Sequence, residues 1–168
     1  MKTILLNNGK EAIVDDSDFD EISKYKWYGN GTSNGMIIYA KRRTKKSDGR
    51  KEKIISMHRQ IMNFPEGKHI DHRNHNGLDN RHCNLRICTG TENMFNRRRL
   101  KNKSGFVGVS WFKRLKKWRS SVCLTIGYFD SKEEAARAYD EAAKKLFGEF
   151  ANLNFPDDKK RCDMNNKK

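Results

Sequence analysis

Apolar residues in the first third of the chain fall in short runs separated by turn residues. Two of these runs, within residues 4–6 and 12–14, flank Asn8-Gly9, a dipeptide typical of a tight hairpin turn, so we expect a β-hairpin over residues 2–14. The polar stretch 15–26 carries apolar residues at helical spacing and predicts a short helix, and the runs 27–28 and 36–40 predict two strands. Together these patterns predict a small β-rich N-terminal unit over residues 1–56.

The C-terminal third shows two different hydrophobic periods. Residues 106–112 and 117–124 alternate with the period of a strand, and residues 126–129 make a third short strand. Residues 131–147 place their apolar side chains on one helical stripe. Ser131 with Glu134 forms a capping box before this stripe, and Gly148 suits the position after a helix end. We therefore expect a three-stranded antiparallel sheet packed on one helix.

The middle of the chain has the pattern of a hairpin followed by a helix. Residues 67–72 and 84–88 predict an outgoing and a returning strand, with a turn at Asn76-Gly77. Thr89 and Glu92 form a second capping box, so a helix is expected to begin near Gly90.

Composition narrows the class of protein. The 168 residues include 36 Lys and Arg against 21 Asp and Glu, a formal net charge of +15, and only 35% are hydrophobic. No stretch reaches the roughly 20 apolar residues of a membrane span, and the apolar start Met1–Leu6 meets Asn7-Asn8 too soon for a signal-peptide core. We therefore expect an intracellular, cytoplasmic protein that is not membrane-bound and has a polyanionic partner, most simply a nucleic acid.

The positive charge is concentrated between residues 93 and 129. This stretch contains ten basic residues and no Asp or Glu, and aromatic residues interleave with them. A charge run by itself is usually a solvated face, but one mixed with aromatic residues favours contact with phosphates. The basic residues are Arg97, Arg98, Arg99, Lys101, Lys103, Lys113, Arg114, Lys116, Lys117 and Arg119.

All five histidines lie between residues 58 and 82, beside Asp and Asn residues. Such clustering suggests a metal or general-base site. Cys83 and Cys88 with His75 and His82 could complete a zinc ligand set on paper, but the paired spacing of a structural zinc site is missing. We expect reduced, partly buried thiols, and the zinc alternative stays open.

Asp71-His72, then Asn84-Leu85-Arg86, then Asn93 resembles the HNH endonuclease motif, which has a ββα-metal fold, and the flanking residues resemble its phage and intron-associated homing branch. The resemblance implies that Asp71 and Asn93 hold one Mg²⁺ or Mn²⁺ ion. It also implies that His72 is the general base and that Asn84 orients the His72 ring. Oxygen ligands and a neutral imidazole suit the hydrolysis of a phosphodiester.

Residues 104–156 resemble the ethylene-response-factor (Apetala-type) DNA-binding domain of plants. The matching pieces include Gly105–Val109, Trp118, Gly127–Phe129, Glu133–Asp140 and Leu153–Phe155. The resemblance implies that the sheet faces double-stranded DNA. Trp118 alternates with Arg119 and Ser121 along its strand, so we expect it to face the helix. The residues at the DNA-facing positions depart from the family, so the fold carries over but the base-reading code does not. Besides the basic residues above, these positions include Ser110, Phe112 and Ser121.

We interpret the chain as an α+β protein with four parts. They are a β-rich unit (1–56), a ββα-metal HNH core (57–100), a DNA-binding domain (101–156) and a disordered tail (157–168). The expected function is that of a site-directed, metal-dependent DNA endonuclease, monomeric on its site and nicking one strand. The rivals are a non-catalytic DNA-binding regulator and a protein that binds or cleaves RNA.

Overall fold

The N-terminal strands form the hairpin that the sequence predicts. The structure is a computed structural model in which residues 1–31, 37–44, 52–96 and 102–156 are described. Strands β1 (Lys2–Leu5) and β2 (Glu11–Val14) pair antiparallel, and Gly9 takes a φ of 75°, the left-handed conformation that a tight turn needs. Helix α1 (Asp16–Ile22) follows at once.

A three-stranded antiparallel sheet comes next, in the order β3 (Tyr28–Gly31), β4 (Ile38–Arg43) and β5 (Ile54–Ser56). The short helix α2 (Met57–Ile61) begins at the residue after β5. Tyr39 on β4 and His58 on α2 thereby come within ring contact, with centroids 5.7 Å apart.

The predicted central hairpin consists of β6 (His69–His72) and β7 (Leu85–Cys88), and α3 (Gly90–Phe95) follows it. The long loop between the two strands is tied to the N-terminal hairpin through Ile13. The Ile13 amide donates to the Leu78 carbonyl, and the Asn80 amide donates to the Ile13 carbonyl, both at 2.8 Å. The N-terminal hairpin therefore supports the loop that carries the middle of the motif.

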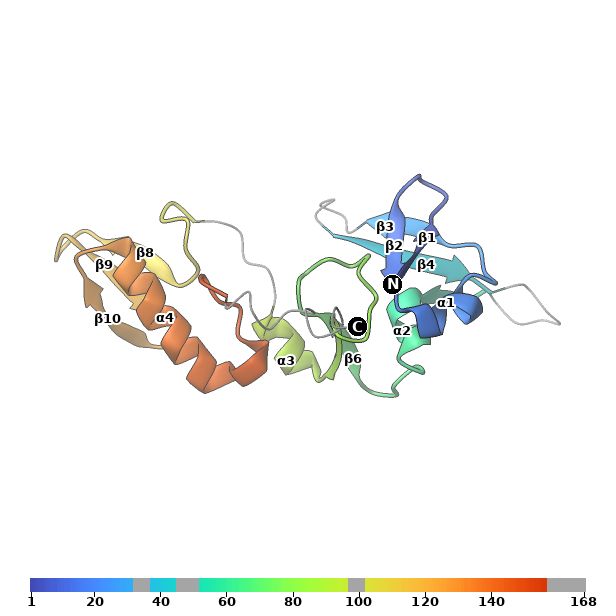
Figure 1. Cartoon of the computed structure of the whole chain (residues 1–168). Helices are drawn as coiled ribbons and strands as arrows, with labels where there is room; N and C mark the ends of the chain where they lie inside the picture. The colour runs from blue at the N-terminus through green and yellow to red at the C-terminus, as the bar shows by residue number, and fades with distance from the viewer. Residues whose placement is uncertain (32–36, 45–51, 97–101, 157–168) are drawn as a thin grey trace, which may run out of the picture. The chain divides into compact units, whose positions relative to one another are not determined.

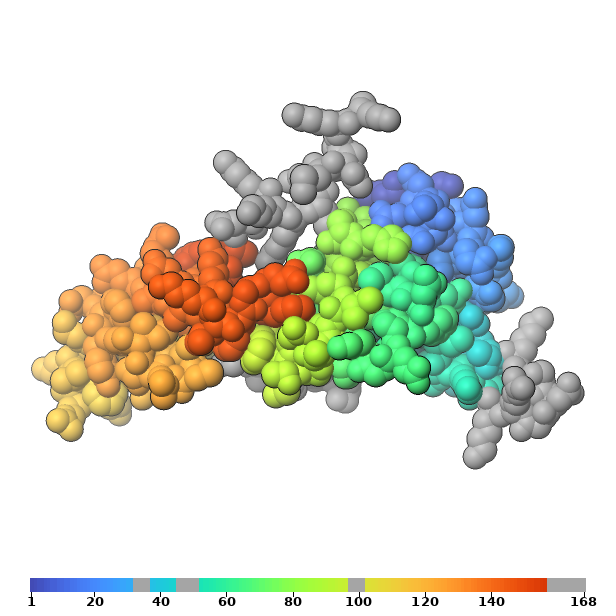
Figure 2. Space-filling view, turned by 90° about the horizontal axis from the view of Figure 1, so that it is seen from below, coloured from blue at the N-terminus to red at the C-terminus, as the bar shows by residue number. Residues whose placement is uncertain are grey.

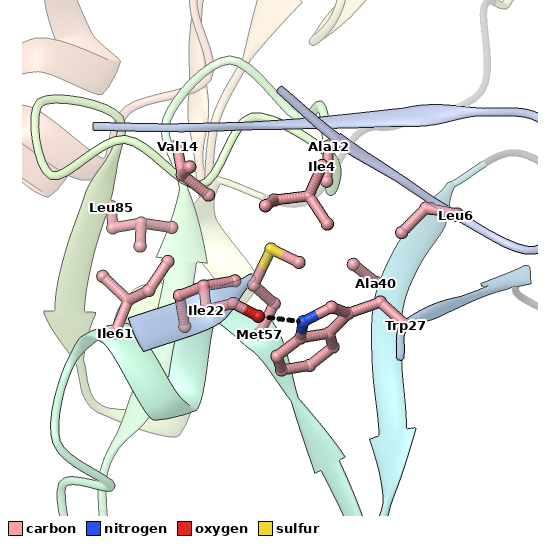
Figure 3. Packing of buried hydrophobic residues seen from close by; sticks show 10 residues of the cluster. All are labelled: Ile4, Leu6, Ala12, Val14, Ile22, Trp27, Ala40, Met57, Ile61 and Leu85. Carbon is pink, nitrogen blue, oxygen red and sulfur yellow. Dashed lines mark hydrogen bonds between the residues drawn. The ribbon is translucent and has the colours of Figure 1, made fainter. Parts of the chain in front are cut away.

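One hydrophobic core joins the N-terminal strands to the central hairpin. Figure 3 shows Met57 and Leu85 packed among side chains from β1, β2, α1 and β4, and the indole of Trp27 donates to the Ile22 carbonyl at 2.8 Å. Figure 2 shows the described residues of this unit, coloured blue to light green, packed side by side. Met1–Gly90 form one compact unit, so no separate core marks the expected boundary between residues 56 and 57.

The second compact unit, Thr91–Lys160, contains the expected sheet and helix. Strands β8 (Val109–Phe112), β9 (Lys117–Ser121) and β10 (Thr125–Phe129) pair in the order β10-β9-β8, and α4 (Lys132–Phe147) lies across them (Figure 1). The interface between sheet and helix is apolar. Its members are Val109, Ala135 and Ala136 with Phe106, Trp118, Phe129 and Phe155 around them.

Local hydrogen bonds stabilise the start of α4 and attach the segment that follows α4 to the helix. The Ser131 hydroxyl accepts from the Glu134 amide at 3.1 Å, as the capping box predicts, and a short 3-10 helix, Gly148–Phe150, follows α4. The buried carboxylate of Asp140 accepts from the backbone amides of Asn154 and Phe155, each at 2.8 Å. The α+β class and the sheet packed on a helix are therefore confirmed.

Candidate functional site

Asp71 and His72 are neighbours on β6, and their side chains lie on opposite faces of the hairpin because successive residues of a strand alternate. Asp71 is paired with Arg86 and His72 with Leu85 across the two strands. Directly opposed residues share a face. Asp71 is 8% exposed and His72 4% exposed, so both candidate groups are largely shielded from bulk water.

The carboxylate of Asp71 accepts hydrogen bonds from the guanidinium of Arg86. Nε and Nη2 of Arg86 donate to Oδ2 of Asp71 at 2.8 Å and 2.6 Å. Burial of an unpaired carboxylate is costly, so this cation compensates the charge that Asp71 brings into the hairpin. The Asp71 carboxylate therefore forms a buried ion pair with the Arg86 guanidinium.

The imidazole of His72 has a defined orientation. Its Nε2 lies 3.4 Å from Oδ1 of Asn80, a residue that is completely buried. An amide oxygen accepts and cannot donate, so in this contact Nε2 carries the proton and Nδ1 carries the lone pair. Burial lowers the pKa of His72 below its usual value, although Asn80, Asp71 and Asp79 act in the other direction. The ring is therefore neutral at physiological pH, the state that a general base requires.

Two further rings surround His72. The His58 ring meets it edge to face with centroids 5.1 Å apart, and the Tyr39 ring lies at 5.7 Å. Burial, helped by His72 and the nearby cations, lowers the pKa of His58 to about 3, and its Nδ1 is buried without a hydrogen-bond partner among the described residues. Burial and the charge of Asp71 raise the pKa of Tyr39. The sequence cluster of histidines pointed to His58, whereas nothing in the sequence pointed to Tyr39.

The side chain of Asn84, which the resemblance implies orients the His72 ring, is hydrogen-bonded within the loop between β6 and β7. Its Oδ1 accepts from the Asn74 amide at 3.0 Å, and its Nδ2 donates to the Asp79 carbonyl at 2.7 Å. The side chain therefore holds the loop between β6 and β7, and the contact on the His72 ring comes from Asn80 instead. Asn80 was not among the predicted site residues.

Asn93, the second predicted metal ligand, lies half-buried on α3. Two residues further on, Phe95 stacks on Phe147 of α4, with ring centroids 4.1 Å apart. The helix that carries Asn93 thus packs against the main helix of the second unit.

His82 takes part in a separate polar cluster. Its Nε2 lies 3.1 Å from Oδ2 of Asp18, and its backbone amide donates to Asp15 at 2.8 Å. Among the described residues, Asp15, Asp18 and His82 are the group whose ligand atoms would fit a metal ion. Their contacts tie the start of α1 to the loop after β6.

The described cysteines do not support the zinc alternative. Cys88 is buried and Cys123 is exposed, both outside a disulfide, whereas Cys83 is disulfide-bonded, against the expectation of a reduced thiol. Neither Cys83 nor Cys88 belongs to a metal-ligating group among the described residues.

The sheet of the second unit presents a basic and aromatic face. Cross-strand pairing places Ser110, Arg119 and Tyr128 in one row and Phe112 opposite Lys117. These residues alternate with Val109, Trp118 and Phe129, which pack toward α4, so the row lies on the face away from the helix. Lys113, Arg114 and Lys116 are exposed in the turn between β8 and β9, Lys103 is exposed, and Ser121 is half-buried at the end of β9.

Arg119 lies within an aromatic setting on this face. Its guanidinium stands 6.0 Å from the centre of the Phe112 ring, and Phe112 in turn contacts Tyr128 with centroids 5.1 Å apart. Its Nε is buried and has no hydrogen-bond acceptor in the described part of the chain.

Some of the predicted DNA-binding residues lie outside the described residues, as does the tail 157–168. They are Arg97, Arg98, Arg99 and Lys101.

No helix in the described ranges has the length and apolar character of a membrane span.

The family model for HNH endonucleases matches residues 63–95. An uncharacterized HNH endonuclease of Acanthamoeba polyphaga mimivirus is 31% identical over 156 residues, which cover 88% of this chain and 77% of that protein. Protein 3.8 of Escherichia phage T7 is 41% identical over 98 residues, or 52% of this chain and 77% of that protein.

Plant proteins match a shorter stretch. An ethylene-responsive transcription factor of Arabidopsis thaliana is 42% identical over 60 residues, covering 32% of this chain and 24% of that protein. No solved structure matches the chain. Because the mimivirus protein is matched over most of both chains, this chain belongs to the HNH endonuclease family, and it carries in addition a region similar to plant ethylene-responsive transcription factors.

Proposed function

We propose that this protein is a metal-dependent DNA endonuclease that hydrolyses phosphodiester bonds. The observation that carries the proposal is that a buried, neutral imidazole, His72, directly follows a buried carboxylate, Asp71, on one strand. Both residues lie inside the segment that the HNH family model matches. A neutral imidazole can take a proton from water, and a carboxylate can hold a hard cation.

In the proposed reaction, His72 removes the proton from the attacking water through Nδ1. Asn80 keeps Nε2 protonated and the ring in place, since its Oδ1 lies 3.4 Å from that nitrogen. Asn84 acts one step further away, because it holds the loop on which Asn80 sits.

Asp71 and Asn93 are the residues that would hold Mg²⁺ or Mn²⁺. Carboxylate and amide oxygens are the donors that these ions prefer. A bound ion would stabilise negative charge on the phosphate and on the departing oxygen.

We propose that the second unit selects the DNA site. Arg119 and Lys117 lie on the outer face of its sheet, and Lys113, Arg114 and Lys116 follow in the adjoining turn. Arg119 lies beside Phe112 and opposite Tyr128 on this face, a position from which its guanidinium would contact a base or phosphate. Arg97, Arg98, Arg99, Lys101 and Lys103 would add phosphate contacts, and Ser110, Phe112 and Ser121 would lie against the groove.

A single candidate active site within the described residues favours a monomer that nicks one strand. The mimivirus relative is named as an HNH endonuclease, and together with the resemblance of the sequence to the homing branch this favours a homing endonuclease. The test is incubation of the purified full chain with supercoiled DNA, linear DNA and RNA, with Mg²⁺ or with EDTA. Nicking of DNA that stops with EDTA supports the proposal; binding without cleavage favours a regulator, and cleavage of RNA alone favours a ribonuclease.

A further inference from the structure

The ion pair between Arg86 and Asp71 places a permanent cation on a proposed metal ligand. The two residues face each other across β6 and β7, and both are largely buried, at 6% and 8% exposure. The contact is short, 2.6 Å at its closest. Arginine stays protonated at all physiological pH values, so this positive charge is present whenever the pair is formed.

A second Arg–Asp pair in the same hairpin provides a comparison. Arg81 meets Asp79 as a fork, with Nε on Oδ1 and Nη2 on Oδ2, both at 2.8 Å. Arg86 instead directs Nε and Nη2 to the same oxygen, Oδ2 of Asp71. The Arg81 pair has the two-oxygen geometry of a bidentate ion pair, and its carboxylate is not a proposed metal ligand, so Arg81 is a suitable control for Arg86.

We infer that Arg86 is an internal competitor of the metal ion for the Asp71 carboxylate. The inference rests on the proposed function, since it takes Asp71 as a metal ligand. A divalent cation that approaches Asp71 is repelled by a guanidinium bonded to that carboxylate, and at a buried site such repulsion is weakly screened. The ion must displace Arg86 from Oδ2 or bind against it, so Arg86 lowers the affinity of the DNA-free protein for metal.

The displaced guanidinium then becomes a donor for another anion. Arginine binds phosphate through the same N–H groups that it uses for carboxylate. A DNA phosphate that accepts Arg86 would release Asp71 for the metal, and linkage requires that the metal in turn favour phosphate binding. Arg86 is in this way a positioning residue that couples metal loading to DNA binding.

The first test measures Mn²⁺ affinity of the full chain without DNA, from the electron paramagnetic resonance signal of free Mn²⁺. Arg86→Gln keeps an N–H donor for Asp71 but removes the charge, and we expect it to bind Mn²⁺ about tenfold more tightly or better. Arg86→Lys keeps the charge and should remain near the wild-type affinity. Arg81→Gln, the matched control, should change the affinity less than about twofold. Unchanged or weaker binding by Arg86→Gln would overturn the inference, because a purely structural Arg86 supports the metal ligand.

The second test uses the wild-type protein and so does not depend on how a variant folds. In a nitrogen-proton NMR spectrum of the arginine side chains, saturating Mg²⁺ should shift the Nε–H signal of Arg86 and leave that of Arg81 in place. An Arg86 signal that stays unchanged contradicts the inference, provided that Mn²⁺ broadens the backbone amides near Asp71. If Mn²⁺ broadens none of these amides, or if Asp71→Asn binds Mn²⁺ as wild type does, the proposed metal site itself is wrong.

Discussion

The imidazole rings of His58 and His72 meet edge to face, with their centroids 5.1 Å apart. His58 lies on α2 and His72 on β6, and both rings are largely buried. A proton on either ring would place a charge beside the other ring, and burial lowers the pKa of both. Burial therefore keeps both imidazoles neutral, and for His58 the neighbouring His72 adds to this effect.

This pair predicts that stability falls as the pH is lowered. The pKa of His58 is about 3 in the folded protein, against 6.5 as its ordinary value. Between these values the unfolded chain binds the proton and the folded protein does not, so stability present above pH 6.5 is lost as the pH falls. From pH 7.5 to 5.0, we expect His58 to cost about 1 to 2 kcal/mol.

Urea unfolding at these two pH values measures the effect. His58→Gln should lose part of the pH dependence, whereas His69→Gln, a change at an exposed position of β6, should retain it. A full wild-type difference in His58→Gln would contradict the assignment of this proton to His58.

Asn84→Ala is expected to destabilise the first unit. It removes two hydrogen bonds of a buried amide and leaves the Asn74 amide and the Asp79 carbonyl without these contacts. The expected loss is about 2 to 3 kcal/mol in the free energy of unfolding. Asn76→Ala is the matched control, since Asn76 makes an exposed contact to the Leu78 amide in the same loop. An equal, small effect of both changes in thermal unfolding would rule out the role given to Asn84.

Two glycines of the second unit should respond differently to alanine. Gly108 has a φ of +73°, and a Cβ there would lie 2.1 Å from the Tyr139 ring and 2.6 Å from the Ser121 carbonyl oxygen. Gly105 has a φ of +80°, but a Cβ there meets nothing within 4 Å. Gly105→Ala should therefore cost roughly 1 kcal/mol of backbone strain, and Gly108→Ala about 3 kcal/mol or more. Calorimetry of the two variants compares them, and similar melting temperatures would show that the packing of Gly108 on α4 is wrong.

The proposed DNA face predicts a contrast between Arg119 and Lys132. Arg119 lies on the outer face of the sheet, and Lys132 begins α4, which covers the other face. Arg119→Ala should weaken DNA binding by about 1 to 3 kcal/mol if the side chain meets a base, or lower the slope of log affinity against log salt by about 1 if it meets a phosphate. Lys132→Ala should change neither. Fluorescence anisotropy with a labelled duplex over a salt series measures both, and equal effects would remove the sheet from the recognition surface.

Local structure was predictable from the sequence where one short segment determines it. Asn8-Gly9 marks its hairpin because glycine tolerates the left-handed turn, and Ser131 marks the start of α4 because its hydroxyl caps the helix. The same holds for the strand that carries Asp71 and His72 and for the alternation that turns Trp118 inward. These features depend on neighbours within a few residues.

The supporting contacts of the site were not predictable in this way. Asn80 reaches His72 only because the loop after β6 folds back and is held by Ile13, a residue far away in the sequence. Arg86 meets Asp71 through the register of β6 on β7, which a shift of one residue would change. Tyr39 and His58 reach His72 through a core shared by segments whose hydrophobic patterns look independent.

The most direct test of the account is plasmid nicking by His72→Ala, with His69→Ala on the same strand as its control. Both variants are compared with wild type in Mg²⁺, at DNA concentrations above the dissociation constant measured for each. The account predicts that His72→Ala loses at least about 100-fold in nicking rate while its DNA affinity stays within about twofold, and that His69→Ala cuts as wild type does. Nicking by His72→Ala at a near wild-type rate would contradict the assignment of His72 as the general base and, with it, the proposed active site.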